Sequence, residues 1–240
     1  MNYPNEIKVG ERVYPIFYEL TRKYTSSVRF RKGGVAMTLS RFASDKKRDE
    51  MVECFLKWAE KRLSKVTDEL LVPEYEDGGR ICTHNKVYEL EVHATKRRNS
   101  VARIKDGHII QVFLMEELPL GDRRKKMKML VDNIIIKDQE PYLLEVLEEL
   151  NQLYFQERIN EIRFKKVSSR FGSCSSRRNI NIAFRLLFAP REVFRYVCVH
   201  ELAHLKEMNH SKRFWAWVEA AMPEYREAEK WLSNNGFVLG

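Results

Sequence analysis

A short stretch towards the C-terminal end has the residue types and spacing of a metal site. Residues 200–204 read His200-Glu201-Leu202-Ala203-His204, the pattern H-E-x-x-H. On a helix, residues i and i+4 lie on one face, so both imidazoles can reach the same metal ion. Neutral imidazoles suit Zn²⁺ with a coordination position left open, and the glutamate can take a proton from a water held by the metal. Chance would give about 0.01 such matches in a chain with this histidine content.

His210 is the candidate third ligand, provided that the helix ends after His204. At 100° per residue, six residues turn by about 240° net, so an unbroken helix would point His210 away from the metal. Asn209 permits the helix to end, because asparagine tolerates the left-handed conformation. The alternative third ligand is a downstream glutamate, Glu219 or Glu224, as in sites that combine two histidines with a glutamate.

The sequence pattern around this motif predicts both helices and strands, and therefore an α+β fold. Residues 191–206 have helical periodicity and would carry the motif. Strands are expected at 159–167 and 179–184, separated by a small polar turn or loop over 168–176. A helical segment after residue 121 is expected to break at Pro141. No internal repeat is evident.

The first 120 residues predict a strand-rich region with one helix. Alternating apolar residues on both sides of Gly33-Gly34 indicate a hairpin over 27–41, and Ser44 is a candidate helix cap. We therefore expect a strand-rich N-terminal region, 1–120, packed on a helical zincin-like unit, 121–240, with one continuous domain as the alternative.

The composition is that of a globular protein. The 240 residues are 44% hydrophobic and 32% charged, with a net charge of +9, and four scattered cysteines do not suggest a disulfide framework. The sequence shows neither an apolar leader nor a membrane-spanning run, so we expect a cytoplasmic protein without a membrane partner.

The polar stretch upstream of the motif is a candidate substrate-binding segment. If it lies beside the metal helix, its backbone or the side chains of Arg170 and Ser173 could position a substrate or bind an oxyanion; a tight turn around Gly172 is the alternative. An edge strand near the helix, expected at 179–184, could hold an extended peptide by strand addition.

The motif and its surroundings resemble the YgjP-like metallopeptidase family, which is related to the SprT-like and WLM metalloproteases. The resemblance is specific over residues 168–240 and weaker over the N-terminal strands. It implies a zinc-dependent hydrolase with Glu201 as general base. The resemblance is carried by Ser169–Ser175, Pro190, Tyr196–Leu205, Asn209–Ser211 and Phe214-Trp215, and it implies His200, His204 and His210 as metal ligands.

We therefore expect a zinc metallopeptidase that hydrolyses peptide bonds of a peptide or protein substrate through a metal-bound water activated by Glu201. Two alternatives stay open, because basic clusters occur at 29–32, 96–98 and 123–126. One is a nucleoside triphosphate pyrophosphatase or phosphohydrolase that uses the same site. The other is a nucleic-acid-binding protein with a structural metal.

Overall fold

The computed structural model describes residues 3–31, 34–64, 75–236 and 239, and the chain divides into two compact units. Unit 1 comprises Met1–Val72 together with Trp231–Gly240, and unit 2 comprises Pro73–Lys230. Strands and helices are both abundant, which confirms the α+β class. The domain boundary near residue 120 stays a prediction; residue 120 lies within unit 2, at the start of a long helix.

Unit 1 is a four-stranded sheet covered on one face by a helix. Its order is β1-β2-β4-β3, with β2 and β4 parallel and the outer pairs antiparallel. Alternate strand residues such as Met37 and Leu39 meet one stripe of the helix in the core. Ser44 caps the helix, as predicted, by accepting a hydrogen bond from the Lys47 amide. The elements are β1 (Glu6–Val9), β2 (Arg12–Thr21), β3 (Ser27–Arg31), β4 (Gly34–Ser40) and α1 (Asp45–Leu63).

Unit 2 begins with the same arrangement. Its sheet has the order β5-β6-β8-β7, again with a parallel central pair and antiparallel outer pairs, and a helix follows. We call β1–β4 with α1 module 1 and the second set module 2. The elements of module 2 are β5 (Arg80–Cys82), β6 (Val87–Thr95), β7 (Val101–Lys105), β8 (Ile109–Met115) and α2 (Leu120–Leu150).

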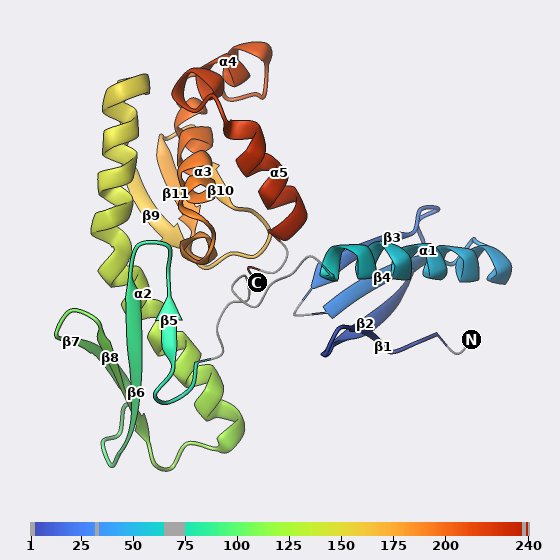
Figure 1. The fold of residues 1–240 in the computed structure, drawn as a ribbon, viewed down its shortest axis with the longest axis horizontal. Coiled ribbons are helices and arrows are strands. Elements are labelled where there is room, and N and C mark those ends of the chain that lie inside the picture. Colours follow the sequence, from blue (N-terminus) through green and yellow to red (C-terminus); the bar gives the residue numbers. More distant parts are fainter. Residues whose placement is uncertain (1–2, 32–33, 65–74, 237–238, 240) are drawn as a thin grey trace. The chain divides into compact units, whose positions relative to one another are not determined.

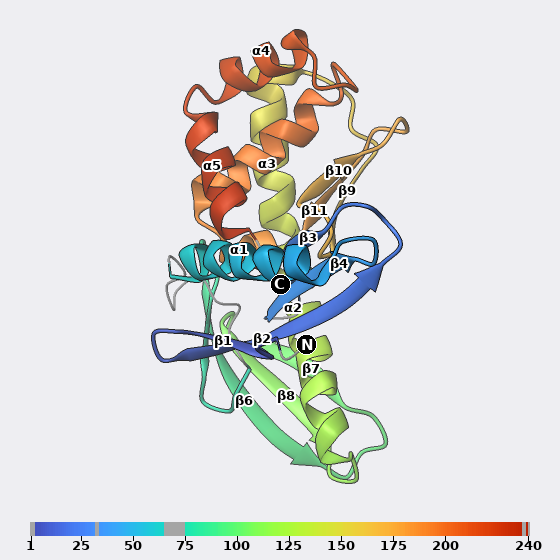
Figure 2. The ribbon, with the colours of Figure 1, turned by 90° about the vertical axis from the view of Figure 1, so that its right-hand side faces the viewer.

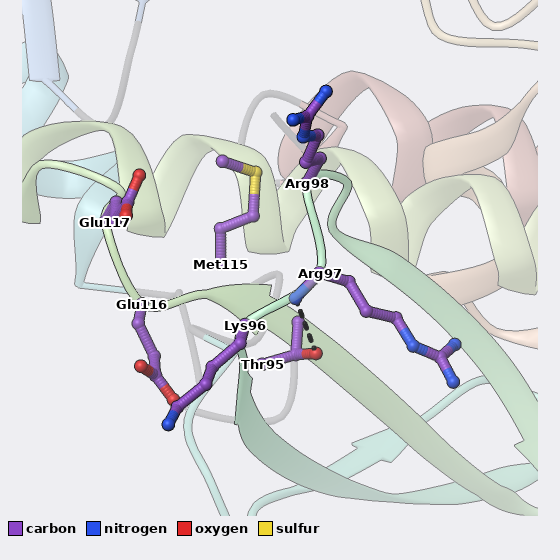
Figure 3. A pocket seen from close by; sticks show the side chains of 7 residues that line it. All are labelled: Thr95, Lys96, Arg97, Arg98, Met115, Glu116 and Glu117. Carbon is purple, nitrogen blue, oxygen red and sulfur yellow. Dashed lines mark hydrogen bonds between the residues drawn. The ribbon is translucent and has the colours of Figure 1, made fainter.

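The two modules also share hydrogen bonds at equivalent positions, 74 or 75 residues apart by the printed numbering. Figure 3 draws one of them, at the end of β6. Three bonds of module 1 have a counterpart in module 2. The module 1 bonds run from Ser40 N to Ser26 Oγ, from Lys23 N to Thr21 Oγ1 and from Arg41 N to Thr21 O. Their counterparts, in the same order, run from Met115 N to Ser100 Oγ, from Arg97 N to Thr95 Oγ1 and from Glu116 N to Thr95 O. The chain therefore contains an internal structural repeat, which the sequence analysis missed because strands preserve alternation and register rather than residue identity.

The remainder of unit 2 holds the sequence motif. A three-stranded sheet has the order β10-β11-β9, so β11 is central and the expectation of an edge strand at 179–184 is wrong. The edge strands are β9 and β10, and β10 lies within the segment 168–176 that was expected to be a turn or loop. The elements are η2 (Asn151–Phe155), β9 (Glu161–Lys165), β10 (Gly172–Cys174), β11 (Asn179–Ala183), η3 (Phe184–Phe188), α3 (Arg191–Ala203), α4 (Lys212–Ala221) and α5 (Tyr225–Asn235).

Helix α2 joins module 2 to this part of unit 2. It contacts β7 and β8 of the module as well as β9 and α3, and Figures 1 and 2 show it passing from the sheet to the C-terminal helices. The helix continues through Pro141, so the expected break there is wrong. Leu143, Val146 and Leu147 are buried just beyond the proline, and their packing outweighs the helix-breaking cost of about 3 kcal/mol.

Candidate metal centre

Helix α3 and the turn after it bring the three histidines of the motif together. His200 lies in the last turn of α3 and His204 immediately follows its end at Ala203. The chain then turns before α4 begins at Lys212, so the prediction that the helix does not continue to His210 is confirmed, although α3 ends slightly earlier than expected. Asn209 does not adopt the left-handed conformation that we expected; its side chain instead accepts a hydrogen bond from the Ser211 amide.

The three imidazoles converge on one point. One ring nitrogen from each of His200, His204 and His210 lies within 4.8 Å of the others, and the Nε2 atoms of His200 and His210 are 3.1 Å apart. Two ligands 2.0–2.1 Å from a tetrahedral zinc would be separated by about 3.3 Å. These residues therefore fit a tetrahedral metal ion. The alternative ligands Glu219 and Glu224 are not part of this cluster in the described part of the chain.

The aromatic ring of Phe214 packs against all three histidine side chains. Phe214 is fully buried, and its ring centroid lies 4.9 Å from that of His200, 4.6 Å from that of His204 and 4.7 Å from that of His210. Ser211 caps α4 by accepting a hydrogen bond from the Phe214 amide, which fixes the start of this helix beside the site. Phe214 thus packs against all three candidate ligands.

The surroundings keep at least two of the imidazoles neutral. Burial, followed by the nearby His204 and His210, lowers the pKa of His200 to about 4. Burial also lowers the pKa of His204, whose Nδ1 lies 3.2 Å from the Glu207 carbonyl oxygen. A neutral imidazole keeps the lone pair that a metal requires, and a hydrogen bond at Nδ1 orients the other nitrogen towards the metal.

Glu201 is the only acidic side chain that is buried beside the histidines among the described residues. It is 5% exposed, and burial raises the pKa of its carboxyl to about 7 against opposing effects of the Arg170 charge and a hydrogen bond from the Cys174 backbone. Its Oε2 has no hydrogen-bond partner. A carboxyl that is poised near neutral pH and has a vacant oxygen is suited to accept and return a proton.

Strand β10 positions this carboxyl. A Cβ built on Gly172 would lie 2.7 Å from the Cγ and 2.8 Å from the Cδ of Glu201, so only glycine leaves room for the side chain. The sequence analysis gave a tight turn around Gly172 as one of two interpretations of this segment. The position of Gly172 before a short polar run was the available signal, but the approach to Glu201 depends on tertiary packing.

The two predicted substrate-binding residues lie on this same segment. Arg170 is exposed, and its charge acts on the Glu201 carboxyl. Ser173 pairs with Asn181 across the sheet and accepts a hydrogen bond from the Asn181 side chain at 3.3 Å. Because side chains alternate along a strand, the Ser173 side chain lies on the face opposite Gly172, so its backbone is the part nearest the candidate site.

A further carboxylate, Glu157, holds the loop between His204 and His210. Its two oxygens meet Lys206 of that loop at 2.9 Å and Arg178 of the β10–β11 turn at 2.5 Å. Hydrogen bonds from Arg178 and Lys206 lower the pKa of Glu157. The sequence offered no signal for this residue, which is distant from the motif along the chain.

The basic cluster at 96–98 shares its surroundings with two acidic residues. Its side chains line an open hollow of about 640 Å³ together with Glu116 and Glu117. The negative charges of these two glutamates offset part of the positive charge of the cluster. In Figure 3 the side chains of Lys96, Arg97 and Arg98 point in different directions. The nucleic-acid partner considered from the sequence gains no support from this arrangement. No described helix is sufficiently long and apolar to cross a lipid bilayer.

A family model and two solved structures resemble this chain. A family model described as YgjP-like, metallopeptidase domain, matches residues 24–235. Abylysin from Pyrococcus abyssi, solved as a metallopeptidase zymogen, aligns at 25% identity over 38% of this chain and 92% of its own, with a TM-score of 0.35. Jannalysin from Methanocaldococcus jannaschii, also a metallopeptidase zymogen, aligns at 22% identity over 38% and 93%, with a TM-score of 0.34. A search of curated proteins found no match.

Proposed function

The chain belongs to the YgjP-like metallopeptidase family, and from this premise we propose that it cleaves peptide bonds with a zinc ion held by His200, His204 and His210 and with Glu201 as general base. The observation that carries the proposal is the convergence of three ring nitrogens within 4.8 Å of one another beside a buried glutamate. Three nitrogen ligands are typical of catalytic zinc sites, which keep a fourth position open.

When bound, zinc supplies a Lewis acid that polarises the scissile carbonyl and lowers the pKa of water. The chain's own residues perform the proton transfers. Glu201 takes a proton from the attacking water and delivers it to the amine nitrogen that leaves. Burial gives this carboxyl a pKa of about 7, so it can serve first as base and then as acid near neutral pH.

Strand β10 is the natural place for the substrate backbone. It is an edge strand of its sheet, contacts α3 and carries Gly172, which lies against Glu201. An extended peptide that pairs with the free edge of β10 would run past Glu201, and alternate side chains would leave on opposite faces. We propose that Arg170, which precedes this strand and is exposed, contacts the substrate.

The deciding experiment compares zinc-loaded protein with Glu201→Gln on an unfolded protein substrate and on nucleoside triphosphates. We expect cleavage of the protein substrate and a loss of at least about 100-fold in Glu201→Gln, because general bases contribute that much or more. Glu192→Gln, an exposed glutamate of the same helix, is the matched control and should retain activity. Glu201-dependent release of phosphate or pyrophosphate with the protein substrate untouched would overturn the proposal.

A further inference from the structure

The two modules differ on the sheet face that points away from their helix. In module 1 the helix α1 covers the face that contains Met37 and Leu39. We call the opposite face the outer face. Its side chains lie in rows that run across neighbouring strands. Its central positions are Phe17 and Glu19 of β2, Ala36 and Thr38 of β4, and Arg29 of β3.

In module 2 the equivalent face is filled by its own side chains. Arg103 donates from Nε to Oε1 of Gln111 at 2.9 Å, and Gln111 donates from Nε2 to Oε2 of Glu91 at 2.6 Å. The ring of Phe113 occupies the next row, with the Arg103 guanidinium 5.1 Å from its centroid and His93 stacked at 5.1 Å. An amide and an aromatic ring therefore complete this sheet face.

Module 1 lacks both groups. By strand register, Ala36 stands at the position of Gln111 and Thr38 at that of Phe113, while Arg29 keeps the position of Arg103. The missing volume leaves a hollow of about 360 Å³ whose lining includes Phe17, Glu19 and Arg29.

The groups around this hollow are available to a ligand. Phe17 is 48% exposed, which is unusual for a phenylalanine on a sheet. The Phe17 ring lies close to Gly34, where a Cβ would be 3.1 Å from Cε2 of Phe17 and 2.9 Å from Cγ of Pro15, so this glycine leaves room for the ring. Within the described part of the chain, the side chains of Arg29 and Glu19 make no hydrogen bond or ion pair.

We propose that this hollow binds an aromatic side chain of an extended polypeptide, and so serves as a substrate-docking site apart from the metal centre. The ring would lie against Phe17 and beneath the Arg29 guanidinium, as the ring of Phe113 lies beneath Arg103 in module 2. The adjoining peptide group would lie where the Gln111 amide lies in module 2, its carbonyl accepting from Arg29. Because Phe17 stands at the position of Glu91, the peptide N–H would donate instead to Glu19, which stands one row away at the position of His93. The inference rests on the proposed function only in taking a polypeptide as the occupant.

Charge favours a polypeptide over a nucleic acid. Arg29 and Glu19 lie on the same hollow with opposite charges, so the lining offers no net attraction to a phosphate backbone. A peptide group has both a donor and an acceptor, and it can satisfy both side chains at once. A nucleobase could stack on Phe17, but its phosphates would meet the Glu19 carboxylate.

The test measures binding by the full-length Glu201→Gln protein, so that no step of cleavage is needed. The probe is a fluorescein-labelled glycine-serine peptide with one central phenylalanine. The control peptide is identical except that alanine replaces the phenylalanine. We expect the phenylalanine peptide to bind about tenfold more tightly by fluorescence anisotropy, since a stacked and desolvated ring contributes about this factor. Adding Phe17→Ser or Arg29→Ala should remove the difference between the peptides, while Leu20→Ser, an exposed residue of the same strand outside the hollow, should not.

A second variant refills the hollow from within. Ala36→Gln combined with Thr38→Phe introduces the residues that module 2 has at these positions, and it should also abolish the preference for phenylalanine. Thermal unfolding verifies that each variant folds, and the exposed sites Phe17 and Arg29 keep the test valid if the refilled variant does not. Equal binding of the two peptides, a preference that survives Arg29→Ala and Phe17→Ser, or binding of oligothymidylate in place of the peptide would each overturn the inference. Failure of Glu201-dependent cleavage would leave this result unchanged.

Discussion

Gly172 of the edge strand β10 lies directly against the side chain of Glu201 in helix α3. A methyl group at position 172 would come within 2.8 Å of the Glu201 Cδ, which is closer than side-chain carbons approach one another. Burial on this side and the hydrogen bond from the Cys174 backbone hold the carboxyl in one orientation. The strand that would receive the substrate therefore also sets the position of the candidate general base.

Gly172→Ala should reduce peptide cleavage by about 100-fold while the protein still binds one equivalent of zinc. The added Cβ displaces the Glu201 carboxyl, and misplacement of a catalytic group costs about this much. The measurements are the kcat on an unfolded protein and the zinc content of the purified variant. Gly121→Ala is the matched control, because a Cβ at that helical position has nothing within 4 Å. Full activity of Gly172→Ala would show that the close approach is irrelevant to catalysis.

His210→Ala should lower zinc affinity and remove most of the stability gained on metal binding. A ligand that binds only the folded state stabilises that state by about 4 kcal/mol when its free concentration is 1,000 times its Kd. Removing zinc with a chelator should therefore lower the Tm of the wild type but hardly change that of the variant. His108→Ala offers a control, since this exposed histidine is not part of the cluster. The prediction fails if the two histidine variants bind zinc equally well.

In the metal-free protein the contribution of Glu201 to stability should fall as the pH rises from about 5 to about 8. The lowered pKa values of His200 and His204 act in the opposite direction, so the stability of Glu201→Gln should rise more steeply with pH than that of the wild type. The folded-state pKa of Glu201, about 7, exceeds its ordinary value of 4.5, so the native state binds the proton more tightly than the unfolded state. Stability from this group is present below the ordinary value and is lost as the pH rises through the folded pKa, by up to about 3 kcal/mol. The measurement is the urea concentration at the midpoint of unfolding, for the wild type and for Glu201→Gln, each freed of metal by a chelator, at both pH values. Parallel pH profiles would contradict it.

Glu157→Gln should weaken zinc binding about tenfold without touching a ligand. The change removes the ion pair with Lys206, which lies in the loop that connects His204 to His210, and loss of such supporting contacts typically costs 10- to 100-fold in metal affinity. Competition with a chromogenic chelator gives the affinity. In Glu149→Gln the ion pair with Arg195 of α3 is lost instead, and zinc binding should be retained. Equal affinities of the two variants would exclude a role for Glu157 in holding the loop.

The convergence of the candidate site was predictable because it depends on local geometry. The spacing of His200 and His204 follows from the helical period, and the need for the chain to turn before His210 follows from the same arithmetic. The cap at Ser44 and the hairpin of β3 and β4 are likewise encoded within a few residues.

The features that escaped prediction depend on packing between distant segments. The approach of Gly172 to Glu201 and the ion pair of Glu157 with Lys206 join residues from different elements. Pro141 stays within α2 because buried neighbours outweigh a local preference. The repeat of the two modules is recorded in strand register and hydrogen bonds, which diverging side chains conceal.

The division of the chain has a consequence for its synthesis. Unit 1 contains Met1–Val72 and also Trp231–Gly240, so its two parts are translated before and after the whole of unit 2. Arg62 of α1, whose Nη1 donates to the Ser233 carbonyl at 3.3 Å, cannot form this bond until residue 233 has been translated. Unit 1 is therefore completed only after all of unit 2 has been translated, and unit 2 can finish folding first.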